Sequence, residues 1–477
     1  MKKRTSEHFE ILRHSGYLLL ARLFARLASL PFLLYASATL GASLFGVFAF
    51  TLATIDMLSA LGDFGLSRYG ARTLVREAEN RSRTAGIILA LQLVASVILT
   101  AVALVILVAL RPEPVRRDVL LLGLAAAFVS SFIFTTDTIF TAFKRFGASA
   151  FFAVAGRLVY LAAGFAALRL GYSVVAVTAA FLLGMVVESV LRMAFATLRL
   201  TSFSFRSSRA QMVAFARGTV PFAVGAIATM VYFRADTLIM EALRGDTDVG
   251  IYNAAYSFFS FFVWAPIVLS RTLLPGLTRR FAEEPEAAER INWFWYRLVG
   301  IAGVPVAFVV TMTAGPLFRL LMPTAYGNSV IALQILIWSI PPLVMVTVGF
   351  NALVVTDRER RATVTTVVTA LVIVVMDFIL IHFFGVKGAA AAMVIATTAW
   401  LVQVHWLLRR FILAAGHGLK GAFLLPVGGG LLMAGAALLA SPLGLWLSLA
   451  AGLVIYIGVA AGSMLIGRES RPEEAVD

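Results

Sequence analysis

The chain contains no cysteine and has little charge for its length. Only 14% of its 477 residues are charged, whereas a typical soluble domain is about one quarter charged. The lack of cysteine excludes disulfides, thiolate metal sites and a cysteine nucleophile. Hydrophobic residues make up 60% of the chain and the mean hydropathy is +0.92. Since a membrane span needs about 20 predominantly apolar residues, this composition predicts an all-α polytopic membrane protein.

Motifs for the common catalytic and nucleotide-binding chemistries are also missing. The sequence has no G-x-x-x-x-G-K-[ST] phosphate loop, no G-x-S-x-G and no H-E-x-x-H. Its five histidines do not have metal-ligand spacing. We therefore expect a protein that is not an enzyme, does not hydrolyse ATP itself, and needs neither a metal nor a cofactor.

Apolar stretches bounded by charge, glycine or proline predict about fourteen transmembrane helices. They fall near residues 16–38, 43–62, 84–110, 118–142, 147–168, 174–198, 217–242, 249–271, 297–322, 329–355, 362–384, 389–408, 421–440 and 445–466.

The distribution of lysine and arginine predicts the orientation of these spans. With a cytoplasmic N-terminus, the inside segments hold 28 of the 40 Lys and Arg residues, the outside segments hold 6, and 6 lie within spans. This is a clear positive-inside pattern, and an even number of spans places both termini in the cytoplasm. The formal net charge of +15 is thus explained by loop arginines that set the orientation rather than by nucleic-acid binding.

A weak internal repeat suggests two similar halves. Gly41 and Gly46 match Gly245 and Gly250 at an offset of 204 residues, and both pairs follow an outward-running helix. The repeat predicts two six-helix lobes in the same orientation, related by a pseudo-twofold axis along the membrane normal. We expect an N-lobe at 1–200, a C-lobe at 201–410, and two further helices with a cytoplasmic tail at 411–477.

Three arginines within the spans are the strongest chemical signal in the sequence. Arg22 and Arg26 are four residues apart on one face of the first helix, and Arg26 lies roughly 15 Å from the inner surface. Arg157 lies near the middle of the fifth span and has no acid within four residues. Because buried cations need a partner or a polar cavity, these three residues are candidates to bind an anionic ligand.

Other charged residues within spans allow either pairing or ion binding. Arg192 has Glu188 four residues before it, so a structural ion pair is predicted. Asp56 and Asp377 could each pair with an arginine or carry a coupling ion.

Arg234 and Asp236 stand close together in the sequence of the seventh span. They are separated by about 200° around the helix, so they cannot face each other. Asp236 could be an ion site or could tie this helix to a neighbour.

Several segments, in their order along the chain, resemble motifs of one family. They are ALGDFGLSRYGAR (60–72), RADTLIMEALRGDTDVGIYNAAYSF (234–258), FRLLMPTAYGNSVIALQIL (318–336) and, less closely, FGVKGAAAAMV (384–394). The chain resembles the Wzx-type polysaccharide flippases, which translocate O-antigen and exopolysaccharide units and belong to the multidrug/oligosaccharidyl-lipid/polysaccharide (MOP) exporter superfamily.

This resemblance implies a MATE-like arrangement of two lobes around a central cavity that opens alternately to each side of the bacterial inner membrane. The implied cargo is an oligosaccharide on a polyprenyl diphosphate, moved from the cytoplasmic to the outer leaflet. The first-helix arginines and Arg234 would then line the cavity. Implied partners are membrane lipids, a polysaccharide polymerase and other glycan assembly proteins, and no nucleic acid.

Three other functions are compatible with parts of the sequence. A lipid II flippase would also favour a basic cavity. A cation-coupled multidrug exporter would have the same fold but would favour acidic sites, against which the deep arginines argue. A membrane enzyme such as an O-antigen polymerase or ligase would need sizeable outer loops, which the predicted topology does not provide.

Overall fold

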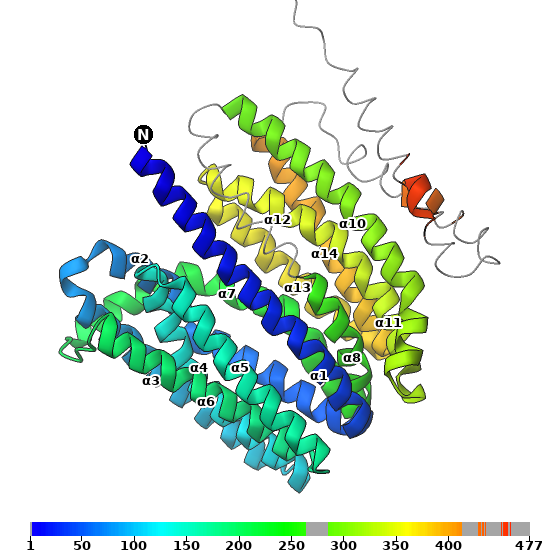
Figure 1. Ribbon diagram of the computed structural model, residues 1–477, viewed down its shortest axis with the longest axis horizontal. Helices are drawn as coiled ribbons and strands as arrows, with labels where there is room; N and C mark the ends of the chain where they lie inside the picture. Colours follow the sequence, from blue (N-terminus) through cyan, green and yellow to red (C-terminus); the bar gives the residue numbers. More distant parts are fainter. Residues whose placement is uncertain are drawn as a thin grey trace, which may run out of the picture. The chain divides into compact units, whose positions relative to one another are not determined.

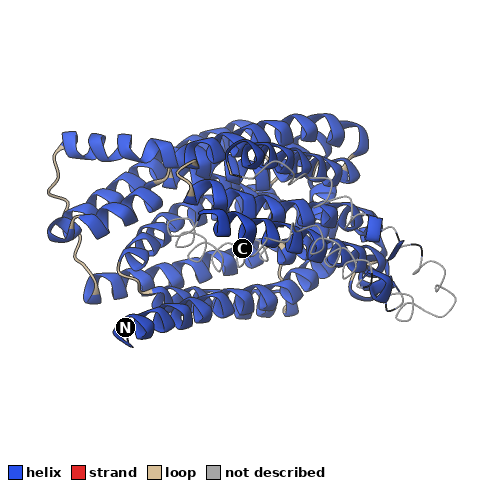
Figure 2. Ribbon diagram, turned by 90° about the horizontal axis from the view of Figure 1, so that it is seen from above, coloured by secondary structure: helices blue, strands red, loops and turns tan. Residues whose placement is uncertain are grey.

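The computed structural model describes the backbone of residues 2–263 and 285–412, together with positions 428–430, 432, 433, 435, 450, 452–456 and 458. Side chains are described from residue 29 onward, except at 78, 285–289, 291 and 300 within those ranges. All regular secondary structure in this part of the chain is helical (Figure 2).

Figure 1 labels the α-helices along the chain. They are α1 (Lys2–Asp63), α2 (Leu66–Arg76), α3 (Arg81–Leu110), α4 (Pro114–Ala142), α5 (Phe146–Arg169), α6 (Val174–Arg199), α7 (Arg209–Arg244), α8 (Asp246–Phe262), α10 (Pro285–Leu321), α11 (Gly327–Leu336), α12 (Ile340–Val355), α13 (Glu359–Phe384) and α14 (Val386–Phe411). Short 3-10 helices cover Ala78–Asn80, Thr324–Tyr326 and Ile337–Ser339.

The predicted spans agree with these helices as far as residue 411, except that residues 264–271 of the span predicted at 249–271 lie outside the described residues. The first two spans together form α1, which departs from helical geometry at Gly41, between them. The span predicted at 329–355 is built from α11, a 3-10 turn and α12. Among the described residues, ten helical segments are long and apolar enough to cross a membrane. Most of the spans predicted at 421–440 and 445–466 lies outside the described residues.

One helix lies where the sequence predicted only a charged loop. Residues 66–76 form α2, which buries Leu66 and Leu74 and leaves Arg68, Arg72 and Arg76 exposed. Its apolar and basic residues separate onto two faces at helical spacing, so burial of one face stabilises the helix. The segment is too short to cross a membrane, and length is the reason that a search for spans passes over it.

The distribution of polar and apolar side chains is inverted relative to a water-soluble protein. Helix α3 has the highest mean hydropathy of the spans, 3.0, yet only 11% of that window is buried. Val94, Val105 and Val108 on this helix are more than half exposed. Arg192, Asp236 and Asp377 are buried instead. Large exposed apolar surfaces mark contact with a membrane or a partner, and here they lie on helices of spanning length.

The chain divides into two compact units, each with its own core. The first comprises residues 1–261, 321–329 and 366–389, and the second comprises 262–320, 330–365 and 390–477. In the first unit, α2, α3, α4 and α7 meet at a cluster that includes Leu74, Ile88, Ile139 and Phe215. A cluster of the second unit joins Val304 and Phe308 of α10 to Met433 and Tyr456. The lobe boundaries at residues 200 and 410 stay predictions.

The glycine repeat has a structural counterpart within the first unit. Gly41 has φ 76° and ψ 168°, and Gly245 has φ 81° and ψ −179°, so both turns use the same glycine-favoured backbone conformation. The helices that follow them touch through Gly46 and Gly250. A Cβ on either glycine would lie 3.0 Å from the backbone nitrogen of the other. Such a reciprocal contact is what a twofold axis between two similar segments produces.

Replacing Gly250 by valine should destabilise this contact. A side chain there would overlap the backbone at Ala42 and Gly46, so α1 and α8 would have to separate, at a cost of about 1–3 kcal/mol. We expect a lower thermal unfolding midpoint in detergent for Gly250→Val. Gly147→Val is the matched control, since nothing lies within 4 Å of a Cβ at that position. Equal midpoints for the two variants would contradict the close approach.

Candidate functional site

Arg234 of α7 forms an ion pair with Asp56 in the second half of α1. The distance between Arg234 Nη2 and Asp56 Oδ2 is 2.5 Å. The guanidinium also lies 5.6 Å from the ring centroid of Tyr256, a cation–π distance. Both charged side chains remain accessible, at 24% for Arg234 and 41% for Asp56. The ion pair is therefore open to exchange with a ligand.

Asp236 lies on a different side of α7 and is fully buried. The Tyr252 hydroxyl donates to Asp236 Oδ2 at 2.5 Å, and the Thr237 backbone N–H donates to Oδ1 at 2.6 Å. This agrees with the angular separation predicted from the spacing of Arg234 and Asp236. The structure thus divides the two charged residues between an accessible position and a buried one.

Asp377 of α13 is the least satisfied charged group in the described part of the chain. Its side chain is fully buried, and neither carboxyl oxygen has a hydrogen-bond partner among the described residues. It lies close enough to Asp236 and Tyr252 to interact with both electrostatically. Arg234 also acts electrostatically on Asp236, and the two buried carboxyl groups would repel each other if both were ionised.

The internal repeat has apolar side chains at the positions that correspond to these polar groups. The offset of 204 residues maps Asp236 onto Phe32 and Tyr252 onto Phe48. Both phenylalanines are fully buried. One copy of the repeat therefore has apolar side chains where the other has a carboxyl group and a phenol. This asymmetry points to a role for the polar copy other than packing.

Arg157 of α5 has no carboxylate within ion-pair distance among the residues that the structure describes. Its guanidinium lies 5.6 Å from the ring centroid of Tyr160. Glu188 acts on it only through longer-range electrostatics, because the Glu188 carboxylate is paired with Arg192 at 2.8 Å. Arg157 is thus a cation within a span whose charge the described side chains do not neutralise directly.

The side chains of Arg22 and Arg26 lie outside the described residues, but the backbone of α1 places their positions. Phe32 contacts the ring of Tyr160, and Tyr35 stacks on Phe165, so the first half of α1 and α5 run in the same direction. Counting back along both helices from these ring contacts places position 26 of α1 within about one helical turn of the level of Arg157 on α5. Helix α1 also packs against α7, which carries Arg234.

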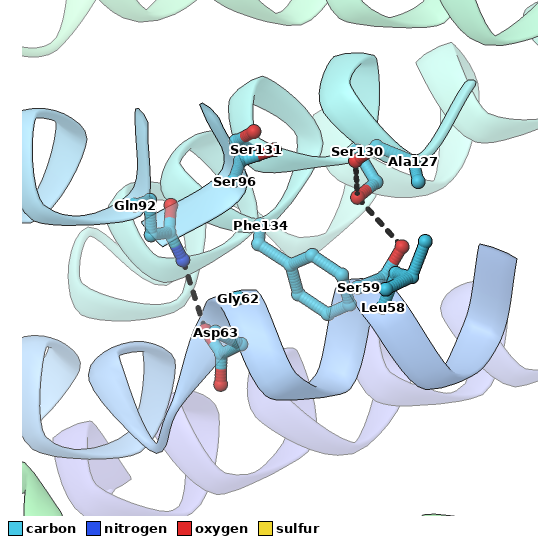
Figure 3. A pocket seen from close by; sticks show the side chains of 10 residues that line it. All are labelled: Leu58, Ser59, Gly62, Asp63, Gln92, Ser96, Ala127, Ser130, Ser131 and Phe134. Carbon is cyan, nitrogen blue, oxygen red and sulfur yellow. Dashed lines mark hydrogen bonds between the residues drawn. The ribbon is translucent and has the colours of Figure 1, made fainter. Parts of the chain in front are cut away.

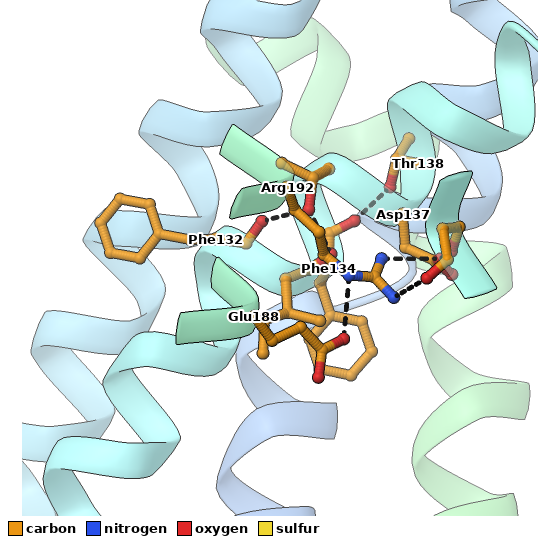
Figure 4. Close-up of polar contacts among 9 residues, drawn as sticks. Phe132, Phe134, Asp137, Thr138, Glu188 and Arg192 are labelled. Carbon is orange, nitrogen blue, oxygen red and sulfur yellow. Dashed lines mark hydrogen bonds and ion pairs between the residues drawn. The ribbon is translucent and has the colours of Figure 1, made fainter. Parts of the chain in front are cut away.

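Arg192 has a structural environment, as the sequence predicted. Figure 4 shows its guanidinium between carboxylates of two helices: Nε pairs with Glu188 at 2.8 Å and Nη1 with Asp137 at 3.2 Å. Nη2 donates to the Ser149 carbonyl at 3.1 Å. Only 4% of the side chain is exposed. Three partners leave this arginine little capacity for a ligand.

Two polar clusters were not predicted from the sequence. At one, Arg116 of α4 pairs with Glu241 and, at 3.2 Å, with Asp246. At the other, Asp63 accepts a 2.9 Å hydrogen bond from Gln92 of α3. Their members are far apart in the sequence, so neither cluster can be predicted from the local spacing of residues. The described residues contain no group of three or more His, Cys, Asp or Glu that could hold a metal ion.

Comparisons with known proteins agree on the fold. Residues 11–275 match the family model described as polysaccharide biosynthesis protein, and residues 221–379 match the MatE model. The probable flippase AglR of Haloferax volcanii is 26% identical over 175 residues, which are 35% of this chain and 36% of that protein. The chain therefore spans about a third of the length of this curated relative.

Two solved structures extend the likeness over most of the chain. The lipid II flippase MurJ in an inward closed conformation has a TM-score of 0.76 and 13% identity, covering 95% of this chain and 99% of that one. An inward-facing multidrug resistance MATE transporter of the MOP superfamily has a TM-score of 0.66 and 17% identity, covering 80% and 93%. The chain thus has the fold of this superfamily.

Arg192 and Arg157 should respond differently to loss of charge. Arg192→Gln leaves the largely buried Glu188 carboxylate and the more exposed Asp137 carboxylate without their cation, so we expect destabilisation of about 3–5 kcal/mol and a low yield of folded protein. Arg157→Gln breaks no ion pair and should retain wild-type yield and unfolding midpoint. Size-exclusion chromatography of the two variants in detergent measures the difference. A well-folded Arg192→Gln protein would contradict the structural role.

Proposed function

Since the chain belongs to the polysaccharide biosynthesis protein family, we propose that it is a flippase for an oligosaccharide linked to polyprenyl diphosphate. The proposed movement is from the cytoplasmic to the outer leaflet of the bacterial inner membrane. Both termini would be cytoplasmic, and the chain would act beside a polysaccharide polymerase and other glycan assembly proteins. The observation that carries the proposal is that, among the described residues, Arg157 has no ion-pair partner and Arg234 pairs only with the accessible Asp56.

The diphosphate of the carrier lipid fits these arginines chemically. Arginine makes paired, charge-assisted hydrogen bonds to phosphate oxygens and keeps its charge at any physiological pH. Arg157 has no ion-pair partner among the described residues, and Arg234 has only the accessible Asp56. We propose that the diphosphate binds Arg22, Arg26 and Arg157 and displaces Asp56 from Arg234. The polyprenyl tail would stay in lipid, so the site needs to enclose only the head group.

Polar contacts at one end of the spans support alternating access. Arg116 at the start of α4 pairs with Glu241 and Asp246, near the junction of α7 and α8. The Tyr326 hydroxyl donates to the Ser37 carbonyl at 2.7 Å, close to the turn at Gly41. In the proposed orientation these residues lie on the outer side. They would close the outer gate, and release of the cargo outward would require these contacts to break.

We propose that Asp236 and Asp377 couple transport to a cation. The two carboxyl groups interact electrostatically; Arg234 also acts on Asp236, whereas the described residues give the Asp377 carboxyl no hydrogen-bond partner. A proton or sodium ion bound there would relieve their repulsion, and its loss would restore it. Binding and release of the ion could therefore shift the balance between conformations of α7 and α13.

A lipid II flippase is the second candidate, since lipid II also carries a diphosphate on a polyprenyl chain. The MurJ-like fold is compatible with it but does not indicate the cargo. A multidrug exporter for cationic compounds is less compatible with uncompensated arginines, because like charges would repel the cargo.

The experiment that separates these functions is a lipid extract from cells depleted of this protein, analysed by mass spectrometry. We expect a polyprenyl diphosphate bearing a complete oligosaccharide to accumulate. Wild-type protein and Arg111→Ala, a change at an exposed position, should reverse the accumulation. Arg157→Ala should lower translocation about tenfold or more at normal protein level, since a charge-assisted contact is lost.

Each other result has a defined meaning. Accumulation of a carrier that bears a peptide would identify lipid II as the cargo. No accumulation of either carrier would contradict flippase activity. Full rescue by Arg157→Ala would be consistent with flippase function but would show that this arginine is not needed to bind the cargo.

Neutralising Asp377 should uncouple transport from its ion. Asp377→Asn keeps the shape of the side chain and removes a buried charge that has no described partner, so the protein should fold normally. In proteoliposomes we expect transport that no longer responds to an imposed proton or sodium gradient. Asp118→Asn, at an accessible position, is the control. An unchanged gradient response in Asp377→Asn would exclude this residue from coupling.

A further inference from the structure

A small polar cavity lies within the first unit, between the last turn of α1 and helices α3 and α4 (Figure 3). It has a volume of about 10 Å³ and is lined by Leu58, Ser59, Gly62, Asp63, Gln92, Ser96, Ala127, Ser130, Ser131 and Phe134. We infer that this cavity binds a single monovalent cation of the size of sodium, at a site separate from the Asp236–Asp377 pair.

Hydrogen bonds between helices hold the oxygen atoms of this cavity in place. Gln92 Nε2 donates to Asp63 Oδ1 at 2.9 Å, and the Thr135 hydroxyl donates to Gln92 Oε1. The hydroxyls of Ser59 and Ser130 are 2.7 Å apart. Because α1, α3 and α4 each contribute to this network, the oxygens are positioned before any ion arrives, as a selective site requires.

Ser96 is the one lining hydroxyl without a hydrogen bond among the described residues, and its side chain is nearly buried. A buried polar group normally has a hydrogen-bond partner, either in the protein or in an ordered water molecule. Since Ser96 lies on the cavity wall, an ion or molecule bound in the cavity could contact its hydroxyl oxygen.

The charge around the cavity favours a cation. Asp63 is the only ionisable residue in the lining. Helix α1 ends at Asp63, so the negative end of its dipole adds to the carboxylate. Phe134 presents an aromatic ring to the same space. The opposing charge that acts on Asp63 is Arg68, which is on the exposed face of α2.

The size and charge of the cavity restrict its occupant. A volume of about 10 Å³ is close to the roughly 10–15 Å³ that one water-sized occupant needs. It is smaller than the pockets of about 300–1,000 Å³ that hold organic ligands, so a sugar unit is excluded. A lining of carboxylate, amide and hydroxyl oxygens suits a hard cation, and a single carboxylate matches one positive charge rather than two.

The test measures sodium binding to the full-length protein in lipid nanodiscs without any lipid-linked oligosaccharide. The thermal unfolding midpoint is recorded in sodium chloride and in choline chloride at equal ionic strength. We expect sodium to raise the midpoint by about 2 °C relative to choline. The shift should disappear in Asp63→Asn, which removes the charge, and in Ser96→Val, which fills the cavity. Ser96→Val breaks no hydrogen bond that the structure describes, so it keeps the test valid if Asp63→Asn folds poorly.

Controls separate this site from the proposed coupling pair. The cavity variants and Ser43→Val, at an exposed position of α1, are made in the Asp377→Asn background, which removes the proposed coupling pair, and there Ser43→Val should keep the sodium shift. A shift that persists in Ser96→Val would overturn the inference. So would a shift lost only in Asp377→Asn, or equal midpoints in sodium and choline for the wild type. Since no flippase substrate is present, each of these results leaves the proposed transport function untouched.

Discussion

An ionised side chain in the hydrocarbon interior of a membrane has no water to solvate it, and this constraint organises the charged residues of the chain. Each deep charge needs an ion pair, a hydrogen-bonding partner or access to a polar space. Arg192 meets the requirement with two carboxylates and a carbonyl. Arg234 meets it with one accessible carboxylate. Arg157 and Asp377 lack ion-pair partners among the described residues, which is why the proposed function assigns a ligand to one and an ion to the other.

The two copies of the glycine repeat share backbone geometry at their turns but differ in chemistry. The paired turns at Gly41 and Gly245 and the contact between Gly46 and Gly250 keep the repeat, because a larger side chain would not fit there. Away from this contact the copies have diverged, so that Asp236 and Tyr252 stand where the other copy has Phe32 and Phe48. In the proposed function, the polar copy would supply the ion chemistry and the apolar copy only the packing.

The fold class could be predicted because a membrane imposes strong and simple rules on sequence. Spans of about 20 apolar residues are visible in any window of the chain, and the turn at Gly41 lies between two of them. Helix α2 was missed because its signal is amphipathic periodicity rather than length. Of the candidate site, the sequence singled out Arg157 and Asp377 as deep charges and paired Arg192 with Glu188. It could not pair Arg234 with Asp56, because contacts between distant helices have no local pattern.

By itself, therefore, the sequence determined the class of protein, the number and order of most helices, and which charged residues lie at membrane depth. These properties follow from the hydropathy of short windows and from spacing along one helix. Only the tertiary structure decided which charges are neutralised, which carboxyls meet, and that Asp63 and Gln92 border a polar cavity. The physical reason is that pairing and burial depend on helix packing across 29 to 178 residues of sequence, as between Asp63 and Gln92 or Asp56 and Arg234.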